Sequence, residues 1–468
     1  MAAGYKKMQA TFYMNNNLRL KKTRPWLFSK KIYQTIFLLI GIHSFSAFAQ
    51  NANTDTLPLK INLPSLVDYT LHHNPLVQSA KIDEALTEAN IKSKLADWYP
   101  QVNFNYSLQH NFILPTSVIS GNPIKAGLYN TSAGQFTVSQ LIFNKDVLLA
   151  NRTRNLVQLQ SSQATISTKI DLAAAVAKAY YDILATSQQV RVAAENIIRT
   201  QRSLQDAYNQ YKVGLVDKID YKRATISLNN AKASQRSNEA LLKAKTEYLM
   251  TLMNYTGSDS LQITADSLEM ENNILLDTLQ KPDYTNRIEY RLLQTQRNLL
   301  KANVAYNHWS YLPSASVNGA YNLNFQNNNF AKLYGTNYPN SYAALTLSFP
   351  IFEGNKRKIN LRAANLQLSK NDYDLANIKN EINTQYAQAL AEYKASMANY
   401  LALKDNVALA KEVYDVVQLQ YRNDIKAYIE VIQSETDYRT SQINYYNALY
   451  QLLSSKIDVQ KALGQINY

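Results

Sequence analysis

The stretches FTVSQLIFNKD (residues 136–146) and LTLSFPIFEGN (residues 345–355) decide the fold of this chain. In both, apolar residues alternate with small polar ones up to an Ile-Phe pair, and charged residues follow. Alternation with a period of two predicts a β-strand. Thr137 returns as Thr346, which is 209 residues later, and Phe143 returns as Phe352. The same strand-to-helix transition is therefore encoded twice.

The composition excludes several classes of function. The chain has no cysteine, so disulfides, thiol catalysis and thiolate metal sites are absent. The net charge is +14, but residues 1–49 hold eight Lys or Arg and no acidic residue, so +6 remains for the rest. This mild excess does not indicate nucleic-acid binding, and we expect no nucleic-acid partner.

Residues 1–49 resemble a secretory signal peptide. A basic stretch ends at Lys30-Lys31, the apolar run TIFLLIGI follows, and Ala47-Phe48-Ala49 offers small residues at the positions that signal peptidase reads. An uncleaved anchor helix is the alternative, although the apolar run is shorter than the ~20 residues that a membrane-spanning helix needs. We expect an exported chain that begins at Gln50.

Two long blocks almost free of glycine and proline predict long helices. In residues 145–213 and 353–421, apolar residues recur with 4-3-4 spacing, as in a coiled coil. Each block would span roughly 100 Å at about 1.5 Å per residue, so we expect an elongated molecule. Shorter helices are predicted at residues 65–98, 218–255, 284–309 and 427–463, with Asn74-Pro75 able to restart the first of these.

Two windows between the helices contain almost no charge. Lys125 is the single charged residue from 101 to 144, and Lys332 is the single one from 310 to 352. Alternation such as Val102-Asn103-Phe104-Asn105 predicts strands. Each window therefore predicts a β-hairpin, at residues 101–142 and 314–351, with loops at 112–131 and 327–340.

The order of the predicted elements repeats itself. Residues 50–257 would hold a helix, a hairpin, a long helix, a tip at 212–218 and another helix. Residues 282–468 would hold the same series, with a tip at 422–427, and residues 258–281 would link the two repeats. We therefore predict an internally duplicated α+β protein.

Exported, uncharged strands of about ten residues with one apolar face suit a transmembrane β-barrel. A sheet in hydrocarbon must pair all its backbone groups, so it cannot stay open. The predicted strands of one chain are too few for a barrel, which predicts an intermolecular one. The alternative is a soluble four-stranded sheet covered by helices, but Asn103, Asn318 and Asn322 would be poor core residues.

At this point the chain resembles the TolC family of outer-membrane efflux proteins over essentially its whole mature length. The resemblance rests on SLVDYTLHHNPLV (65–77), WYPQVNFNYSL (98–108), WSYLPSASVNGAYNL (309–323), YKVGLVDKIDYKRA (211–224) and YRNDIKAYIEVIQS (421–434), together with the two opening stretches.

The resemblance implies an α+β membrane protein that forms a homotrimer in the outer membrane of a Gram-negative bacterium. Four transmembrane strands per protomer would give a twelve-stranded barrel, and coiled-coil-like helices would form a periplasmic α-barrel. Such a channel is the passive exit duct of an efflux or secretion system. Its expected partners are a periplasmic adaptor, an inner-membrane transporter of the RND or ABC type, and outer-membrane lipid.

In this family the helix tips far from the membrane meet the adaptor and close the duct. The resemblance places adaptor docking on two sets of residues: Val213, Gly214 and Leu215 at the first tip, and Asn423, Asp424 and Ile425 at the second. Glycine tolerates the positive φ of a sharp turn, which suits Gly214. At the second tip we expect Asn423 or Asp424 to adopt left-handed geometry.

A pore gate is also implied by the resemblance. Tyr421 and Lys426 align with the tyrosine and arginine that close the tips, and Asp220 aligns with their acidic partner. Glu430 takes the place of one constriction-ring aspartate and Gln433 that of a second, so one ring of charge is missing. The alternative is that these are ordinary solvated charges at a helix end.

Other functions have little support in the sequence. No known catalytic motif is present, so we expect no catalytic residues, no metal site and no cofactor. The remaining alternative is a non-channel periplasmic coiled-coil adaptor or scaffold protein, which would also carry long helical hairpins but would not need the duplicated uncharged strands.

Overall fold

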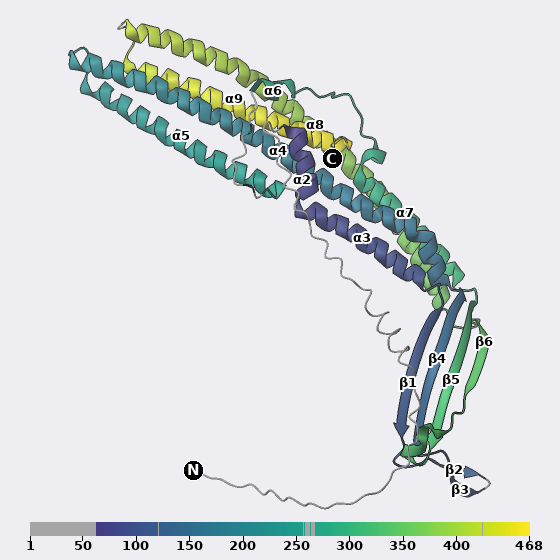
Figure 1. Ribbon diagram of the computed structural model, residues 1–468. Coiled ribbons are helices and arrows are strands. Elements are labelled where there is room, and N and C mark those ends of the chain that lie inside the picture. Colours follow the sequence, from purple (N-terminus) through teal and green to yellow (C-terminus); the bar gives the residue numbers. More distant parts are fainter. Residues whose placement is uncertain (1–61, 120, 256, 258–262, 264–266, 424) are drawn as a thin grey trace, which may run out of the picture. The chain divides into compact units, whose positions relative to one another are not determined.

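The computed structural model describes residues 62–468 except 120, 256, 258–262, 264–266 and 424 (Figure 1). The expected signal peptide lies outside these residues. The helical elements are α2 (Leu63–His73), α3 (Pro75–Ala96), α4 (Lys145–Lys212), α5 (Lys218–Met253), α6 (Ser267–Asn272), η1 (Tyr284–Asn286), α7 (Ile288–Trp309), η2 (Phe330–Gly335), α8 (Lys356–Arg422) and α9 (Tyr428–Leu463). The strands are β1 (Gln101–His110), β2 (Thr116–Ile119), β3 (Asn122–Lys125), β4 (Asn130–Phe143), β5 (Ser314–Asn327) and β6 (Asn340–Ser348).

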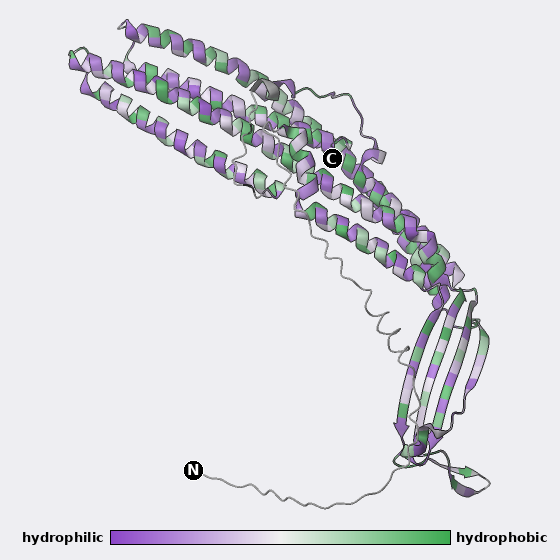
Figure 2. Cartoon of the chain, viewed as in Figure 1, coloured by the Kyte–Doolittle hydropathy of each residue, from purple (hydrophilic) through white to green (hydrophobic). Residues whose placement is uncertain are grey.

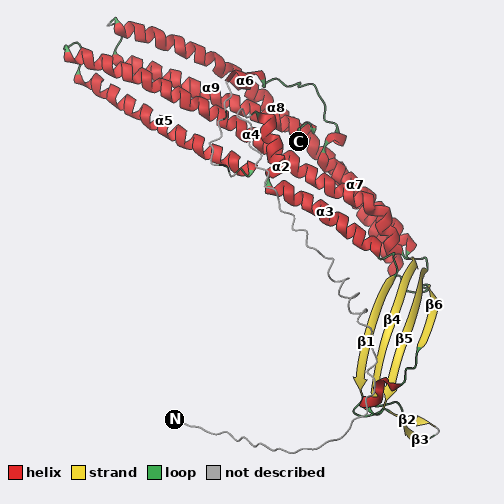
Figure 3. Cartoon of the chain, in the orientation of Figure 1, coloured by secondary structure: helices red, strands yellow, loops and turns green. Residues whose placement is uncertain are grey.

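The long helices and the strands occupy separate segments, as the α+β prediction required, and the short η2 lies between β5 and β6 (Figure 3). The four long strands form one antiparallel sheet in the order β1-β4-β5-β6. Each predicted hairpin supplies two neighbouring strands, and the β4–β5 pairing joins the hairpins. Within the described chain, β1 and β6 each pair on one side, so both edges of the sheet are open.

The register of the sheet separates apolar from polar residues. Residues directly opposite one another in adjacent strands share a face. One row of opposed residues is Phe104, Phe136, Tyr321 and Ser341, whereas the neighbouring row, on the other face, is Asn105, Gln135, Asn322 and Asn340. The Phe104 and Phe136 rings lie 4.6 Å apart. The sheet therefore has an apolar face and an amide-rich face.

Two loops contain structure that the sequence pattern did not predict. The loop at 112–131 contains a second, two-stranded sheet, β2–β3, in which Ile119 pairs with Asn122 across a turn. Gly121 in that turn has φ +84°, which glycine adopts without strain. The loop at 327–340 contains η2, whose buried Leu333 packs against the main sheet.

The helix boundaries follow from local capping. α4 begins after Asn144, whose side chain accepts hydrogen bonds from the backbone N–H groups of Asp146 and Val147. The chain between α2 and α3 turns at Asn74, whose side chain caps Leu76 N at 2.8 Å, with Pro75 as the first helical residue. This restart was predicted. α8 begins three residues later than predicted, at Lys356, because Asn355 is left-handed (φ +64°).

The two long helices match the predicted length. α4 has 68 residues and α8 has 67, so each spans about 100 Å at ~1.5 Å per residue. Apolar residues alternate with polar ones along the strands and are interspersed with them on the helices (Figure 2). Among the helices of the described residues, none is long and apolar enough to cross a membrane.

α4 is the central element of the helical part and packs against α3, α5, α7 and α9. The main core lies where α2, α4, α5, α8 and α9 meet, and its fully buried side chains include Leu66, Leu184, Leu249, Tyr400 and Leu449.

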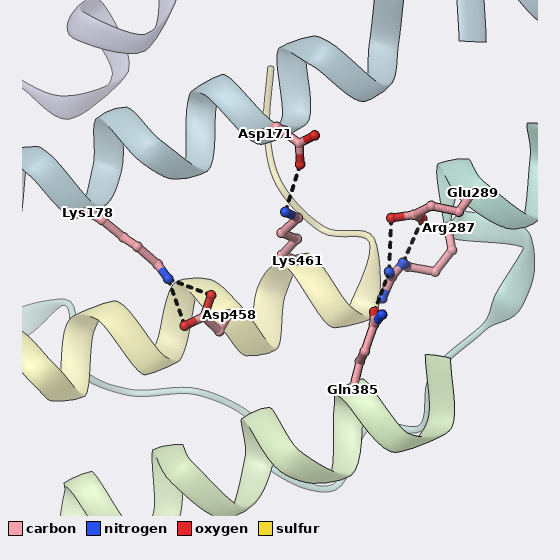
Figure 4. Close-up of polar contacts among 7 residues, drawn as sticks. All are labelled: Asp171, Lys178, Arg287, Glu289, Gln385, Asp458 and Lys461. Atoms are coloured by element: carbon pink, nitrogen blue, oxygen red, sulfur yellow. Dashed lines mark hydrogen bonds and ion pairs between the residues drawn. The ribbon is translucent and has the colours of Figure 1, made fainter. Parts of the chain in front are cut away.

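Polar contacts join the helices beside this core (Figure 4). Lys178 of α4 donates hydrogen bonds of 2.6 and 2.8 Å to the carboxylate of Asp458 on α9. Asp171 of α4 pairs with Lys461 of α9 at 2.7 Å. These two ion pairs join the same two helices, at positions about two turns apart on α4 and less than one turn apart on α9.

Arg287 joins three elements at the end of α9. Its guanidinium is buried and donates to Glu289 on α7, to Gln385 on α8 and to the carbonyl of Ala462 on α9, all within 3.0 Å. Burial raises the pKa of Glu289, but the hydrogen bonds and charge of Arg287, a backbone hydrogen bond and the charge of Lys461 together outweigh this effect and lower it. Arg287 therefore carries a buried charge whose partners are all in place.

We expect Arg287→Ala to lower the free energy of unfolding by roughly 3 kcal/mol, because loss of a buried cation leaves its partners unpaired. Thermal unfolding in detergent, followed by circular dichroism, measures the effect as a lowered Tm. Lys411→Ala is the matched control, since Lys411 pairs with Asp415 on an exposed helix surface, where a pair contributes about 0–1 kcal/mol. Equal shifts in the two variants would contradict the role given to Arg287.

Candidate functional site

The first helix tip connects α4 to α5 by a glycine turn. Gly214 has φ +80° and lies in open space. Leu215 N donates to the carbonyl of Gln210 at 2.9 Å, and Gly214 N donates to the carbonyl of Tyr211 at 3.1 Å. This pattern ends a helix by satisfying its last carbonyls. The conformation predicted for Gly214 is thus confirmed.

The second tip, between α8 and α9, contains the same backbone hydrogen bond between residues five positions apart. Ile425 N donates to the carbonyl of Gln420 at 2.9 Å, as Leu215 does to Gln210. Of the two residues expected to adopt left-handed geometry, Asn423 does not, because its φ is −100°. Asn423 occupies the position of Val213, whose φ is also negative, at −93°. Asp424 lies outside the described residues.

A small apolar cluster holds the two tips together. Its buried members come from α4, α5, α8 and α9: Ala207, Ala224, Tyr421, Tyr428 and Val431. The Tyr421 hydroxyl donates to Gln210 Oε1 at 2.5 Å, which links α8 to α4. The ring centroids of Tyr421 and Tyr428 lie 5.4 Å apart. Of the predicted gate residues, Tyr421 is the one at the centre of this tip cluster.

The charged gate residues bond along their own helical segments. Lys426 donates to Glu430 at 2.6 Å, and Gln433 donates to Asp437 at 2.9 Å. Asp220 lies 3.8 Å from Arg223. Within the described part of the chain, Lys426 and Asp220 form no ion pair with each other. A single chain therefore brings Tyr421 to the tip interface but does not assemble the expected charged network.

The tips expose large apolar side chains. Val213, Leu215 and Ile425 are each about 70% exposed (70%, 68% and 69%). Such exposure is unfavourable in water unless a partner covers the patch. The side chain of Glu430 is partly exposed beside them, with its carboxylate paired to Lys426.

Sequence reasoning did not single out Gln210, which accepts the Tyr421 hydrogen bond, nor Tyr428 of the tip cluster, nor the charge of Arg223. The duplication carried a signal for the first, because Gln210-Tyr211 and Gln420-Tyr421 precede the two tips in the same way. It gave no sign that Tyr421 would be buried at 6% exposure while its counterpart Tyr211 stays 38% exposed.

This difference between equivalent tyrosines yields a test. Tyr421→Ala should lower the free energy of unfolding by roughly 3–5 kcal/mol, as for a buried aromatic residue. Tyr211→Ala should cost about 1 kcal/mol, because Tyr211 has an exposed ring stacked on Tyr221. Tm and the rate of proteolytic cleavage at the tips measure both effects. Similar losses in the two variants would refute the central role of Tyr421.

The sequence is similar to a known protein family and to several known proteins. Residues 66–255 and 289–465 match the family model described as outer membrane efflux protein. The probable efflux pump outer membrane protein TtgC of Pseudomonas putida is 22% identical over 86% of this chain and 82% of its own length. Outer membrane protein TolC of Escherichia coli is 18% identical over 92% of this chain and 86% of its own length.

Solved structures share the fold. A crystal structure of CusC superimposes with a TM-score of 0.71, at 17% identity, over 89% of this chain and 95% of that one. VceC from Vibrio cholerae superimposes with a TM-score of 0.67, at 12% identity, over 86% of this chain and 96% of that one. The family model covers both sequence repeats and each of the four long helices at least in part. The chain belongs to the outer membrane efflux protein family.

Proposed function

We propose that this protein is an outer-membrane channel, the passive exit duct of an efflux or secretion system. The observation that carries the proposal is the sheet with one apolar and one amide-rich face and two open edges. Val102, Phe104 and Leu345 on its apolar face are each more than half exposed in the single chain. Lipid would cover this face, and water in a pore would solvate the opposite one.

We propose a homotrimer, which the family resemblance implies and which would close that sheet. Backbone groups on the β1 and β6 edges must find partners in hydrocarbon. Identical chains can supply them, β6 of one beside β1 of the next, and three copies of a four-stranded sheet give twelve strands. The helical hairpins that continue from the strands would then line a periplasmic tunnel. The duplicated repeats, 50–257 and 282–468, would each contribute one hairpin and one tip.

A non-channel adaptor or scaffold fits less well. Such a protein needs long helical hairpins but has no use for a sheet whose apolar face is uncovered. Cell fractionation separates the two functions: a channel sediments with the outer membrane and requires detergent, whereas release by osmotic shock would favour the scaffold.

The tips would be the docking and gating ends of the duct. An adaptor joined to an RND or ABC-type transporter would cover Val213, Leu215 and Ile425. Threefold repetition of Glu430 would place a ring of carboxylates near the pore axis and favour cations. Because Lys426 already neutralises Glu430 in each chain, the ring would be weaker than one of free carboxylates. Asp220, Tyr421 and Gln433 would complete the closing contacts.

Removing charge at the tips tests the gate. The double variant Glu430→Gln with Asp220→Asn should raise single-channel conductance in planar bilayers and reduce cation preference, because it deletes the ring charge and the contacts that close it. Glu392→Gln, an exposed carboxylate far along α8, is the matched control and should leave both unchanged. Unaltered conductance and selectivity in the double variant would show that these residues do not form the gate.

A further inference from the structure

A buried carboxylate lies between the helices, one turn beyond the tip cluster. Glu435 of α9 is 5% exposed. Its nearest cation is Arg199 of α4, with Nε 3.7 Å from Glu435 Oε1. That distance permits an ion pair but is too long for a hydrogen bond. Glu435 is thus buried beside a cation with which it forms an ion pair but no hydrogen bond.

Several polar atoms around this pair are left without hydrogen bonds. Among the described residues, Glu435 Oε1, Asn196 Oδ1 and both Nε and Nη2 of Arg199 have no hydrogen-bond partner. Arg199 instead stacks over the Tyr438 ring at 5.3 Å. An ionised carboxylate with an oxygen that has lost its water and gained no hydrogen bond is unfavourable, and a cation 3.7 Å away offsets only part of that cost.

A cavity of about 280 Å³ that is partly open to solvent adjoins the carboxylate. It is bounded by α4, α5 and α9, and Glu435 and Asn196 line it together with Arg223 and Arg439. Each water needs about 30 Å³ of liquid volume, so the cavity can admit several. The space needed to hydrate Glu435 therefore already exists between the helices.

The charged and titratable groups around Glu435 come from all four tip helices. They are Arg199 with its neighbour Glu195 on α4, Arg223 with Asp220 on α5, Tyr414 on α8, and Tyr428, Tyr438 and Arg439 on α9. Burial raises the pKa of Glu435 to about 7, because Arg199 and Arg439 offset the desolvation only in part. Burial raises the pKa of Tyr414 to about 12, so that group stays neutral.

The direction of the pH effect follows from this shift. Glu435 has a folded-state pKa above its ordinary value of 4.5, so the folded state binds the proton more tightly than the unfolded chain does. The stabilisation is therefore complete below about pH 4.5 and is lost as pH rises through about 7.

We propose that Glu435 is a proton-controlled wedge between the two helical hairpins of a protomer. The neutral side chain lets α9 pack closely on α4 and α5 beneath the tips. The ionised side chain draws water into the adjoining cavity and loosens that packing. The tips of this protein are accordingly held more firmly in acid than in mildly alkaline solution.

The Tm of the detergent-solubilised protein between pH 5 and pH 8 tests the wedge, with hydrogen–deuterium exchange of peptides from both tips as a local readout. In the parent protein, Tm should fall and tip exchange should rise with pH. Glu435→Gln keeps the shape and removes the titration, so both should become flat and match the parent at pH 5. Glu412→Gln, an exposed carboxylate on α8, should keep the parental profile.

Arg199→Gln gives a second, independent arm. Loss of this cation disfavours the ionised form, so the midpoint of the transition should move to higher pH. A parental slope that survives in Glu435→Gln, or a midpoint that does not move in Arg199→Gln, would overturn the wedge. These measurements do not depend on the proposed channel function. If both variants behave as expected while channel conductance does not change between pH 5 and pH 8, Glu435 controls the packing of the tips but does not control the proposed gate.

Discussion

Water is absent from the hydrocarbon layer, so a strand placed there must find every backbone partner within protein. In this chain β4 and β5 meet that requirement on both sides, whereas β1 and β6 meet it on one. The rest of the architecture is consistent with the resulting need for neighbours. The amide-rich and apolar faces are separated over the central part of the sheet, and the register keeps Asn105, Gln135 and Asn322 in a single row. A closed ring of copies, as proposed, would pair the edges and would place the apolar face toward lipid and the amide-rich face toward the pore.

In the helical part, long helices are held at a fixed spacing without a globular core. Apolar packing is concentrated around Leu184, Tyr400 and Leu449. Beyond it, specific polar contacts such as Lys178–Asp458 and the buried Arg287 align α4, α7, α8 and α9. Near the tips the packing is sparser and more polar, with Tyr421 bonded to Gln210 and Glu435 incompletely paired. The same helices are thus firmly joined in the middle and more adjustable at the end.

Much of this could be predicted from the sequence because its determinants are local. Period-two alternation gave the four long strands, and the scarcity of glycine and proline gave α4 and α8. Gly214 marked its turn, since no other residue type enters that geometry as easily. What sequence reasoning missed depends on tertiary neighbours. Asparagine adopts left-handed geometry more readily than most residues. In this turn, however, Asn423 takes the position equivalent to Val213, whose φ is negative. Glu435 reads as one more helix-surface glutamate until α4 and α5 cover it. The i,i+4 spacing of Lys426 and Glu430 is compatible with the pair that forms, whereas the resemblance pointed to Asp220.

The open edges also have a consequence for how the protein is made. A newly exported chain presents β1 and β6 as two bare templates, and any extended polypeptide nearby can add to them. Formation of the proposed assembly would therefore compete with aggregation, and its yield would depend on how quickly identical chains meet. Secretion of many copies close together would favour closure of the barrel. Slow or dilute synthesis would lengthen the time for which the β1 and β6 edges stay unpaired. Chaperones that cap strand edges during transit would act at this stage, before the lipid bilayer is reached.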